Sequence, residues 1–378
     1  MTFSPFDSIP VTPEEERLAR RWLASSDPST GVGAKHHTVP AFYLRRFADN
    51  KGQLLVRDRP TGRMLPPITV SKLAITDFYT TVNNDGTLDG RMEELLARVE
   101  GEAAQLLKLL VSPYRRPGPL SPAEQTTLCQ FIAFQMVRGP RRRREMELQA
   151  DYAIKLQAGN QLTERDRREI TAVPHPNEHI RLMGPLSHQI FRYLMPRPVQ
   201  IARIDAPLFV TCDEPVLVDN EDHVKHLPEC SLTREQIRRR RRAAMAAGTT
   251  YQQPIHVWPT RPAGVQVADA IAMPLTPSAL LVLGRPGEQY IPEALFRGDE
   301  ARELAEDVNA ALIAQAYVWV AARPGHPSFR DWTFPPPGPL IGVCDGGSIM
   351  SQQLRSAPPH RWQRLRRDWP GIPDKVTN

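Results

Sequence analysis

The sequence predicts an α+β fold, in which a mainly helical N-terminal half packs on a mixed or antiparallel β-sheet from the C-terminal half. Two long segments of the first half, 90–111 and 121–138, place apolar residues at the spacing of one helix face. Strand-like apolar runs gather after residue 199. Helices and strands are therefore segregated along the chain, which favours α+β architecture over alternating β-α-β units.

The chain divides into three predicted parts: a peripheral N-terminal segment 1–34, a single α+β core domain 35–322, and a Pro/Arg-rich C-terminal tail 323–378. A length of 378 residues is enough for a large core. The 38 prolines are about twice the usual share, so we expect short helices and rigid connections.

The same composition predicts a cytoplasmic protein without a membrane partner. The N-terminus lacks the pattern of a signal peptide, and no apolar run is long enough to span a bilayer. The four cysteines form no C-x-x-C pair, which fits reduced thiols.

In the first half, strands are expected at 54–58 and 68–70, followed by the helix 90–111. Ser121-Pro122-Ala123-Glu124 has the form of a capping box and begins the second long helix. Gly139-Pro140 must kink or stop that helix. The next two expected segments are a polar helix from Arg141 to about residue 157 and a Pro-rich connection over 159–186.

The second half begins with helical spacing over 186–194. Strands are expected at 199–204, 208–212, 216–218, 255–258, 270–273, 279–283 and 317–321. Charged helices are expected at 231–247 and 299–314, and Pro274-Leu275-Thr276-Pro277 is expected to form a rigid turn.

The densest chemistry lies in the opening segment of the core domain, 35–48, where His36 and His37 precede Pro40. Proline restricts Val39 to an extended shape, so the two histidines point to opposite sides of the segment. We select His37 as the catalytic candidate, either general base or metal ligand, and His36 as a substrate contact. The alternative is a partly buried histidine that hydrogen-bonds to the backbone and holds the start of the fold.

Three segments together resemble a known family: 36–47, Phe209-Val210-Thr211-Cys212-Asp213-Glu214-Pro215-Val216, and Met273-Pro274-Leu275-Thr276-Pro277. Gln135, Arg138, Gly139, Pro140 and Asn309 occur in the expected order between and after them. Over residues 35–322 the chain resembles the bacterial domain-of-unknown-function family 4238, whose members open with His-x-x-Pro-x-x-Tyr-Leu. Cys212 departs from the serine common there. The resemblance implies no activity.

Each further candidate residue has a structural alternative. Asp213 follows an apolar run at a predicted strand end, where it either faces a cleft or forms an Asx-type turn. Arg138 either pairs with Glu100 or binds a phosphate or carboxylate ligand. Asn309 is either functional or satisfies a neighbouring loop. Glu214 is expected to be solvated.

Charge leaves two interpretations open. The net charge is +6 and the pI is near 9.3, with arginine far commoner than lysine. The excess of arginine reflects either codon usage or a surface that binds polyanions. The runs 141–144 and 238–242 accordingly form either solvated helix surface or contacts to a phosphate backbone.

The leading hypothesis is a nuclease or other phosphoester hydrolase with a His/Asp site. The candidate catalytic residues are His37, Asp213, Arg138 and Asn309, and the candidate substrate contacts are His36, Gln135, Arg141 and Arg142. The cofactor stays open, with a divalent metal as one choice, and the expected partner is nucleic acid or another phosphate-bearing ligand. The alternative is a non-catalytic regulatory module that binds nucleic acid or protein, in which the same residues form a structural polar network.

Overall fold

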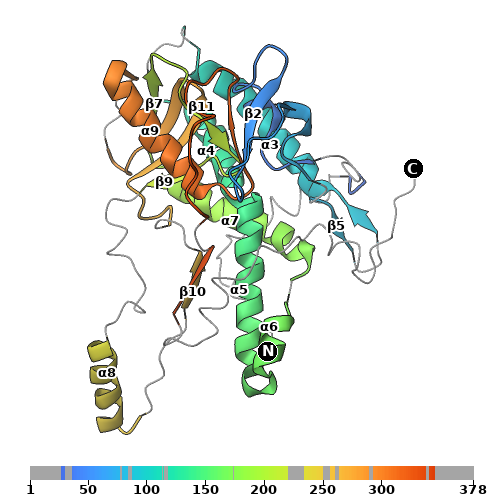
Figure 1. Cartoon of the computed structure of the whole chain (residues 1–378), viewed down its shortest axis with the longest axis vertical. Helices are drawn as coiled ribbons and strands as arrows, with labels where there is room; N and C mark the ends of the chain where they lie inside the picture. The colour runs from blue at the N-terminus through green and yellow to red at the C-terminus, as the bar shows by residue number, and fades with distance from the viewer. Residues whose placement is uncertain are drawn as a thin grey trace.

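The computed structural model describes residues 27–29, 36–76, 79–83, 87–112, 114, 118–172, 174–219, 234–249, 256–259, 264–288, 293–337 and 340–344. Most of the predicted segment 1–34 and the tail beyond 344 lie outside these ranges. The described helices and strands confirm the predicted α+β class (Figure 1).

The larger sheet has five strands in the order β13-β7-β12-β11-β9 and is mixed, because β13 runs parallel to β7 while the other neighbours are antiparallel. Its strands are β7 (Val199–Ile204), β9 (Leu217–Asp219), β11 (Ala270–Thr276), β12 (Ala279–Leu283) and β13 (Ala294–Phe296). The predicted turn over 274–277 is wrong in part. Strand β11 continues through Thr276, and the turn is Pro277-Ser278.

The second sheet is antiparallel, with the order β3-β2-β14-β8. Its strands are β2 (Gln53–Asp58), β3 (Ile68–Thr69), β8 (Thr211–Cys212) and β14 (Trp319–Ala322). Trp319 pairs with Asp58, so this sheet joins strands from both halves of the chain. Three two-stranded ribbons complete the strand pairing: β1 (His36–His37) with β4 (Ile75–Thr76), β5 (Thr81–Val82) with β6 (Leu88–Asp89), and β10 (His256–Pro259) with β15 (Ile341–Cys344).

The two long helices of the first half form as predicted. They are α3 (Arg91–Leu110) and α4 (Pro122–Val137). The Ser121–Glu124 capping box forms both of its hydrogen bonds, since each side chain accepts from the backbone N–H of the other residue. Helix α5 (Pro140–Ala158) begins directly after Gly139. The shorter helical segments are α2 (Ala41–Leu44), η1 (Val70–Lys72) and η2 (Gly159–Gln161).

The prediction of a connection over 159–186 is wrong, because this region forms α6 (Glu164–Glu169) and most of α7 (Pro176–Leu194). Pro176 occupies the first turn of α7, where its missing N–H costs no hydrogen bond. Pro185 lies inside the same helix. Both prolines look like helix breakers in the sequence, and neither ends the helix.

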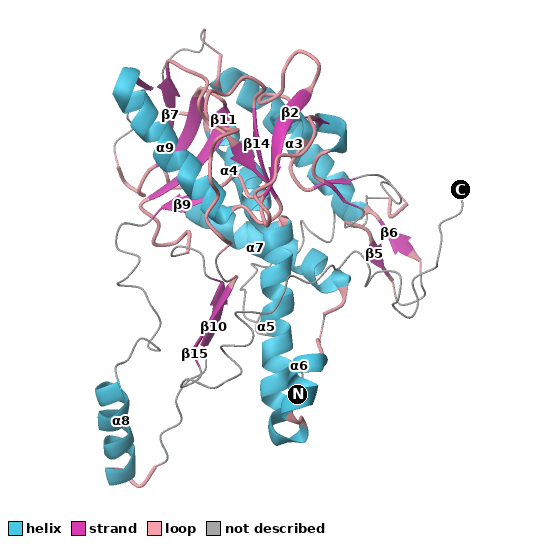
Figure 2. Cartoon of the chain, viewed as in Figure 1, coloured by secondary structure: helices cyan, strands magenta, loops and turns pink. Residues whose placement is uncertain are grey.

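The described core has three layers (Figure 2). On β12, Leu281 packs with residues of α3, α4 and α7, whereas its neighbour Leu280 packs with residues of α9 (Gly298–Gln315). The second sheet alternates in the same way: Val56 packs on the side of α3, α4 and α7, and Leu55 packs on the side of α9. Successive strand residues point to opposite faces, so both sheets are covered on both sides.

Part of the predicted C-terminal tail packs on the α9 side of this core. Phe329 is fully buried there. Arg57 donates to the Phe329 carbonyl at 3.1 Å, and Arg59 donates to the Pro335 carbonyl at 2.8 Å. The segment after β14 is thus fastened to β2 and to the turn that follows it by two arginines.

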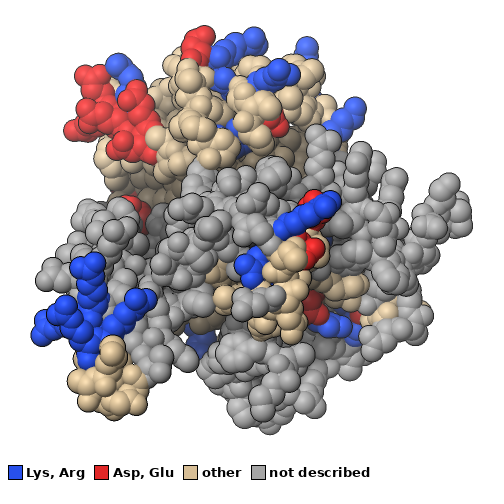
Figure 3. Space-filling model, turned by 60° about the horizontal axis from the view of Figure 1, so that its bottom comes forward, with Lys and Arg blue, Asp and Glu red and all other residues tan. Residues whose placement is uncertain are grey.

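Helix α8 (Arg234–Ala246) is set apart from the layered core (Figure 1). Residues 238–242 are all arginine and all exposed, and blue side chains gather over this helix in Figure 3. No helix in the described ranges is both long and apolar enough to cross a membrane.

Candidate functional site

Tyr43 joins the three segments that carry the family resemblance. Its side chain is fully buried, its hydroxyl lies 2.9 Å from Thr211 Oγ1, and it donates to the Pro274 carbonyl at 2.8 Å. A buried tyrosine hydroxyl needs such partners. Leu44 and Phe47 are also fully buried. The opening segment is therefore anchored in the core shortly after its histidines.

His37 lies at the end of β1 and is half-buried. Its ring makes a backbone hydrogen bond with Val70, yet its Nε2 atom is buried without a hydrogen-bond partner among the described residues. Burial lowers the pKa of His37, and the nearby carboxylate of Glu100 opposes part of that effect. The backbone bond agrees with the structural interpretation of His37, while the unpartnered nitrogen leaves a proton acceptor available.

Arg138 makes the ion pair with Glu100 that the sequence suggests. Its Nη1 atom donates to Glu100 Oε1 at 2.6 Å, and the arginine side chain is 1% exposed. With the amide oxygen of Gln135 facing the guanidinium, that oxygen accepts from Arg138 Nε at 2.8 Å and from Nη2 at 2.5 Å. The buried Tyr79 hydroxyl donates to the Arg138 carbonyl at 3.1 Å. Arg138 and Gln135 thus satisfy each other at the end of α4.

Glu93 belongs to the same cluster and is not among the candidates chosen from the sequence. Burial raises its pKa to about 7, the neighbouring Glu100 contributes to that rise, and Arg138 opposes both effects. Glu93 and Glu100 are seven residues apart on α3, close to two helical turns, so they lie on the same face. This spacing beside a buried stripe is the signal that could have identified Glu93.

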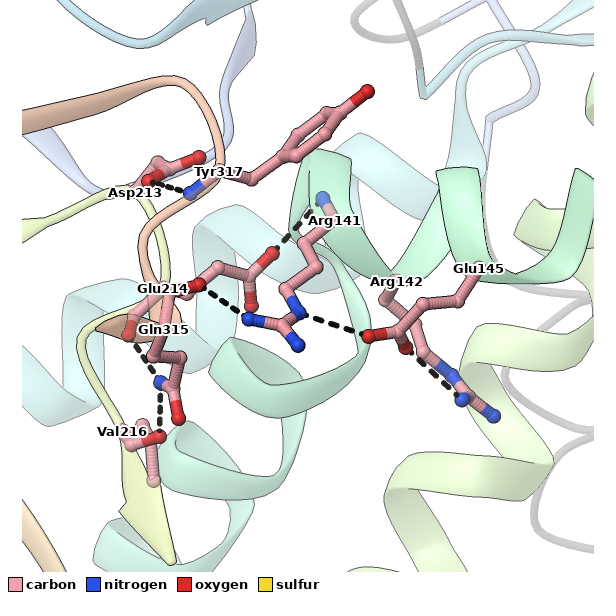
Figure 4. Close-up of polar contacts among 8 residues, drawn as sticks. All are labelled: Arg141, Arg142, Glu145, Asp213, Glu214, Val216, Gln315 and Tyr317. Atoms are coloured by element: carbon pink, nitrogen blue, oxygen red, sulfur yellow. Dashed lines mark hydrogen bonds and ion pairs between the residues drawn. The ribbon is translucent and has the colours of Figure 1, made fainter. Parts of the chain in front are cut away.

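Asp213 follows β8 and is only 2% exposed. Its carboxylate accepts from the backbone N–H of Tyr317 at 3.0 Å (Figure 4) and from the backbone N–H of Val318 at 2.8 Å. Burial raises the pKa of Asp213 to about 6, and the backbone hydrogen bonds oppose this shift. The carboxylate therefore fastens the chain before β14 and does not form a local Asx turn.

His37 and Asp213 have different polar partners. The groups that act on His37 come from Glu100, Arg138, Val70 and Arg45. Those that act on Asp213 are chiefly the backbone of its own residue and of 317–319, together with the charge of Arg59. None of these interactions joins the side chain of His37 to that of Asp213, as the predicted His/Asp site would require.

Glu214 is buried, so the expectation that it is solvated is wrong. Its Oε1 accepts from the backbone N–H of Arg141 at 3.0 Å in the first turn of α5. A Cβ atom at Gly139 would lie only 2.0 Å from that oxygen. Arg141 also donates to the Gln315 carbonyl at 2.8 Å, and Gln315 donates to the Val216 carbonyl at 2.7 Å (Figure 4). These contacts connect α5 to the end of α9.

The run 141–144 is paired with glutamates of its own helix. Arg141 and Arg142 pair with Glu145, and Arg143 and Arg144 pair with Glu147. Arg141, Arg143 and Arg144 are buried. The interpretation of this run as solvated surface is therefore wrong. Two glutamates, three and four residues further along the helix, neutralise half of its positive charge.

Asn309 lies in α9 and is 3% exposed. Its Oδ1 accepts from the Val210 amide at 2.9 Å, and its Nδ2 donates to the Leu208 carbonyl at 2.8 Å. It therefore satisfies the loop before β8, in agreement with the structural alternative. The side chain of His36 lies outside the described part of the structure.

Metal donors are not grouped in the described ranges, where no set of three or more His, Cys, Asp or Glu side chains could hold an ion. His179 instead contacts the Val137 carbonyl through Nε2 at 2.9 Å. Burial, aided by Arg143, lowers its pKa to about 3.

The family model described as protein of unknown function (DUF4238) matches residues 35–237, which is more than half of the chain. That stretch includes His37, the α4–α5 junction and Asp213, and it ends within α8. No curated protein and no solved structure matches the chain. The chain belongs to the DUF4238 family.

Proposed function

We propose that the protein is a hydrolase of phosphate esters whose acid–base centre lies at His37. The observation that carries this proposal is the buried Nε2 of His37, which has no hydrogen-bond partner among the described residues although the other side of the ring is anchored through Val70. A histidine held in this way at neutral pH is suited to accept a proton. The scattered, unpaired spacing of the cysteines supports a cytoplasmic location.

In this proposal His37 takes a proton from water, the water oxygen bonds to phosphorus, and the ester P–O bond breaks. Glu93 gives its proton to the leaving oxygen, for which a pKa of about 7 is suitable. The charges of Glu100 and Arg138 act on both residues, which supports a shared role for His37 and Glu93 in this proposal. Arg45 is exposed and close enough to affect His37, so it is the proposed contact for the phosphate.

Asp213 and Asn309 have positioning roles in this proposal, because each already binds two backbone groups of neighbouring loops. Arg138 likewise sets the charge beside His37 while it stays paired with Glu100. The rival function is a non-catalytic module in which all these residues only hold the fold. The satisfied hydrogen bonds of Asp213, Asn309 and Arg138 favour that rival.

The test is hydrolysis of chromogenic phosphate monoesters and diesters, with and without added Mg²⁺ or Mn²⁺. We expect His37→Asn to lower kcat by about 10²- to 10⁴-fold. His188→Asn, a half-buried histidine that stacks on Phe191, is the matched control and keeps the wild-type rate. Circular dichroism verifies that both variants are folded.

The pH profile distinguishes an acid–base role from a structural one. Activity should rise with pH as His37 loses its proton, at a pKa below 6.5, and fall as Glu93 ionises near pH 7. Glu93→Gln should remove the fall on the alkaline side. Absence of turnover with every ester, or full activity of folded His37→Asn, would favour the non-catalytic rival.

A further inference from the structure

Helix α8 is a dense concentration of positive charge. The helix contains six arginines and one glutamate, which give it a charge of +5, against +6 for the whole chain. The other arginine run, 141–144, is buried for the most part, and its four arginines share two glutamates, Glu145 and Glu147. The arginine run of α8 is therefore the more strongly positive of the two, and it is exposed throughout.

The arginines of α8 surround the helix axis. Consecutive helical residues are about 100° apart, so 238–242 cover the full circumference, and all five are exposed. A helix that lies on a membrane has one basic face and one apolar face. A helix that is basic all round fits a groove whose two walls are both anionic.

The major groove of B-DNA has these properties. It is about 12 Å wide and admits one α-helix, and phosphates line both of its edges. At 13 residues, α8 is about 20 Å long, which matches roughly six base pairs. The major groove of A-form RNA is too narrow for such a helix. The helix contains no aromatic residue on which unpaired bases could stack.

We propose that α8 binds duplex DNA by lying in the major groove, with Arg238 to Arg242 in contact with phosphates on both sides. Arginine forks match phosphate oxygens in two-point hydrogen bonds. Phosphate contacts carry no sequence information, so duplexes of unrelated sequence should bind with similar affinity. The inference concerns binding alone and does not rest on the acid–base centre at His37.

The experiment measures binding of the full chain to fluorescent DNA duplexes of two unrelated sequences, over a salt series from about 50 to 200 mM. The test variant replaces all five residues 238–242 by glutamine, which preserves helix propensity. The matched control replaces five exposed arginines outside α8 by glutamine, and so removes the same charge: Arg165, Arg297, Arg302, Arg323 and Arg330.

We expect the wild type to bind both duplexes with affinities within about threefold of each other. The α8 variant should bind at least about thirtyfold more weakly. Its slope of log affinity against log salt should decrease by about 0.9 for each phosphate that the helix no longer neutralises. The control variant should resemble the wild type.

Equal weakening by the two variants would overturn the assignment to α8, because total charge would then explain the binding. Failure of the wild type to bind duplex DNA at the lowest salt would overturn the proposal itself. Stronger binding to single-stranded DNA, to duplex RNA or to phosphatidylserine vesicles than to duplex DNA would overturn the choice of partner. None of these outcomes alters the test of His37.

Discussion

At the residue scale, the buried polar side chains act chiefly as fasteners between segments that are distant in sequence. Asp213 and Asn309 each hold two backbone groups of a neighbouring loop, and Tyr43 joins three segments. A buried backbone amide that loses its acceptor costs the full desolvation of that group. These side chains therefore stabilise the fold whether or not they also serve a reaction.

Asp213→Asn should lower the free energy of unfolding by about 1–3 kcal/mol, because an amide has one acceptor oxygen and the Tyr317 and Val318 N–H groups need two. Urea denaturation of the two proteins measures the difference. Asp205→Asn is the control, since that exposed carboxylate accepts from the Gly298 amide at the surface, and a change within about 0.5 kcal/mol is expected. Equal stability of the Asp213→Asn variant and wild type would contradict the fastening role.

At the element scale, the junction between α4 and α5 organises the candidate site. The Glu100–Arg138 pair and the Tyr79 hydroxyl hold the end of α4, and Glu214 holds the start of α5. Gly139 stands between them with the Glu214 carboxylate against its Cα. Glycine leaves room for this close approach, and a larger residue would have to move the Glu214 carboxylate.

Gly139→Ala should destabilise the protein by about 1–3 kcal/mol, because its Cβ would displace the Glu214 carboxylate from the Arg141 amide. Gly101→Ala is the matched control. This glycine is exposed inside α3, a Cβ there would meet nothing within 4 Å, and alanine should stabilise the helix by up to about 1 kcal/mol. Thermal unfolding should show a lower melting temperature for Gly139→Ala and an equal or higher one for Gly101→Ala. An unchanged stability of Gly139→Ala would show that Glu214 can move away without cost and would contradict this prediction.

Elements with local signals can be predicted from the sequence, and contacts made across the fold cannot. The capping box at Ser121 and the period of α3 depend on neighbours within four residues, so the sequence indicates both. The ion pairs between 141–144 and Glu145 and Glu147 also join residues within four positions of each other. The sequence could therefore have predicted this pairing, had the glutamates been considered together with the arginines. The partners of Asp213 lie 104 and 105 residues away, and no local pattern indicates them.

At the scale of the whole molecule, two sheets form one middle layer between α3, α4 and α7 on one face and α9 on the other. The second sheet takes β2 from the first half and β14 from the second, so the two halves cannot separate without breaking it. His179 ties α7 to the end of α4 within this core. Its protonation state is therefore linked to the stability of the whole protein.

Acidification should destabilise the fold through His179. Its pKa is about 3 when folded and near 6.5 when unfolded, so between these values only the unfolded chain binds the proton, and stability falls as pH falls. From pH 7 to pH 5 this group should remove about 2 kcal/mol. His179→Gln should reduce the loss between the two pH values measured by urea denaturation, with His188→Gln as the control. An unchanged loss in His179→Gln would contradict the linkage.

The position of α8 also determines how the protein meets a charged partner. This one helix has a charge of +5 and is set apart from the layered core, so it presents a concentrated positive charge at a distance from the core. The field of a polyanion therefore exerts a torque on the whole molecule before contact and turns the helix toward it. Encounters should begin with α8 in front, and the rest of the chain would follow in one preferred orientation.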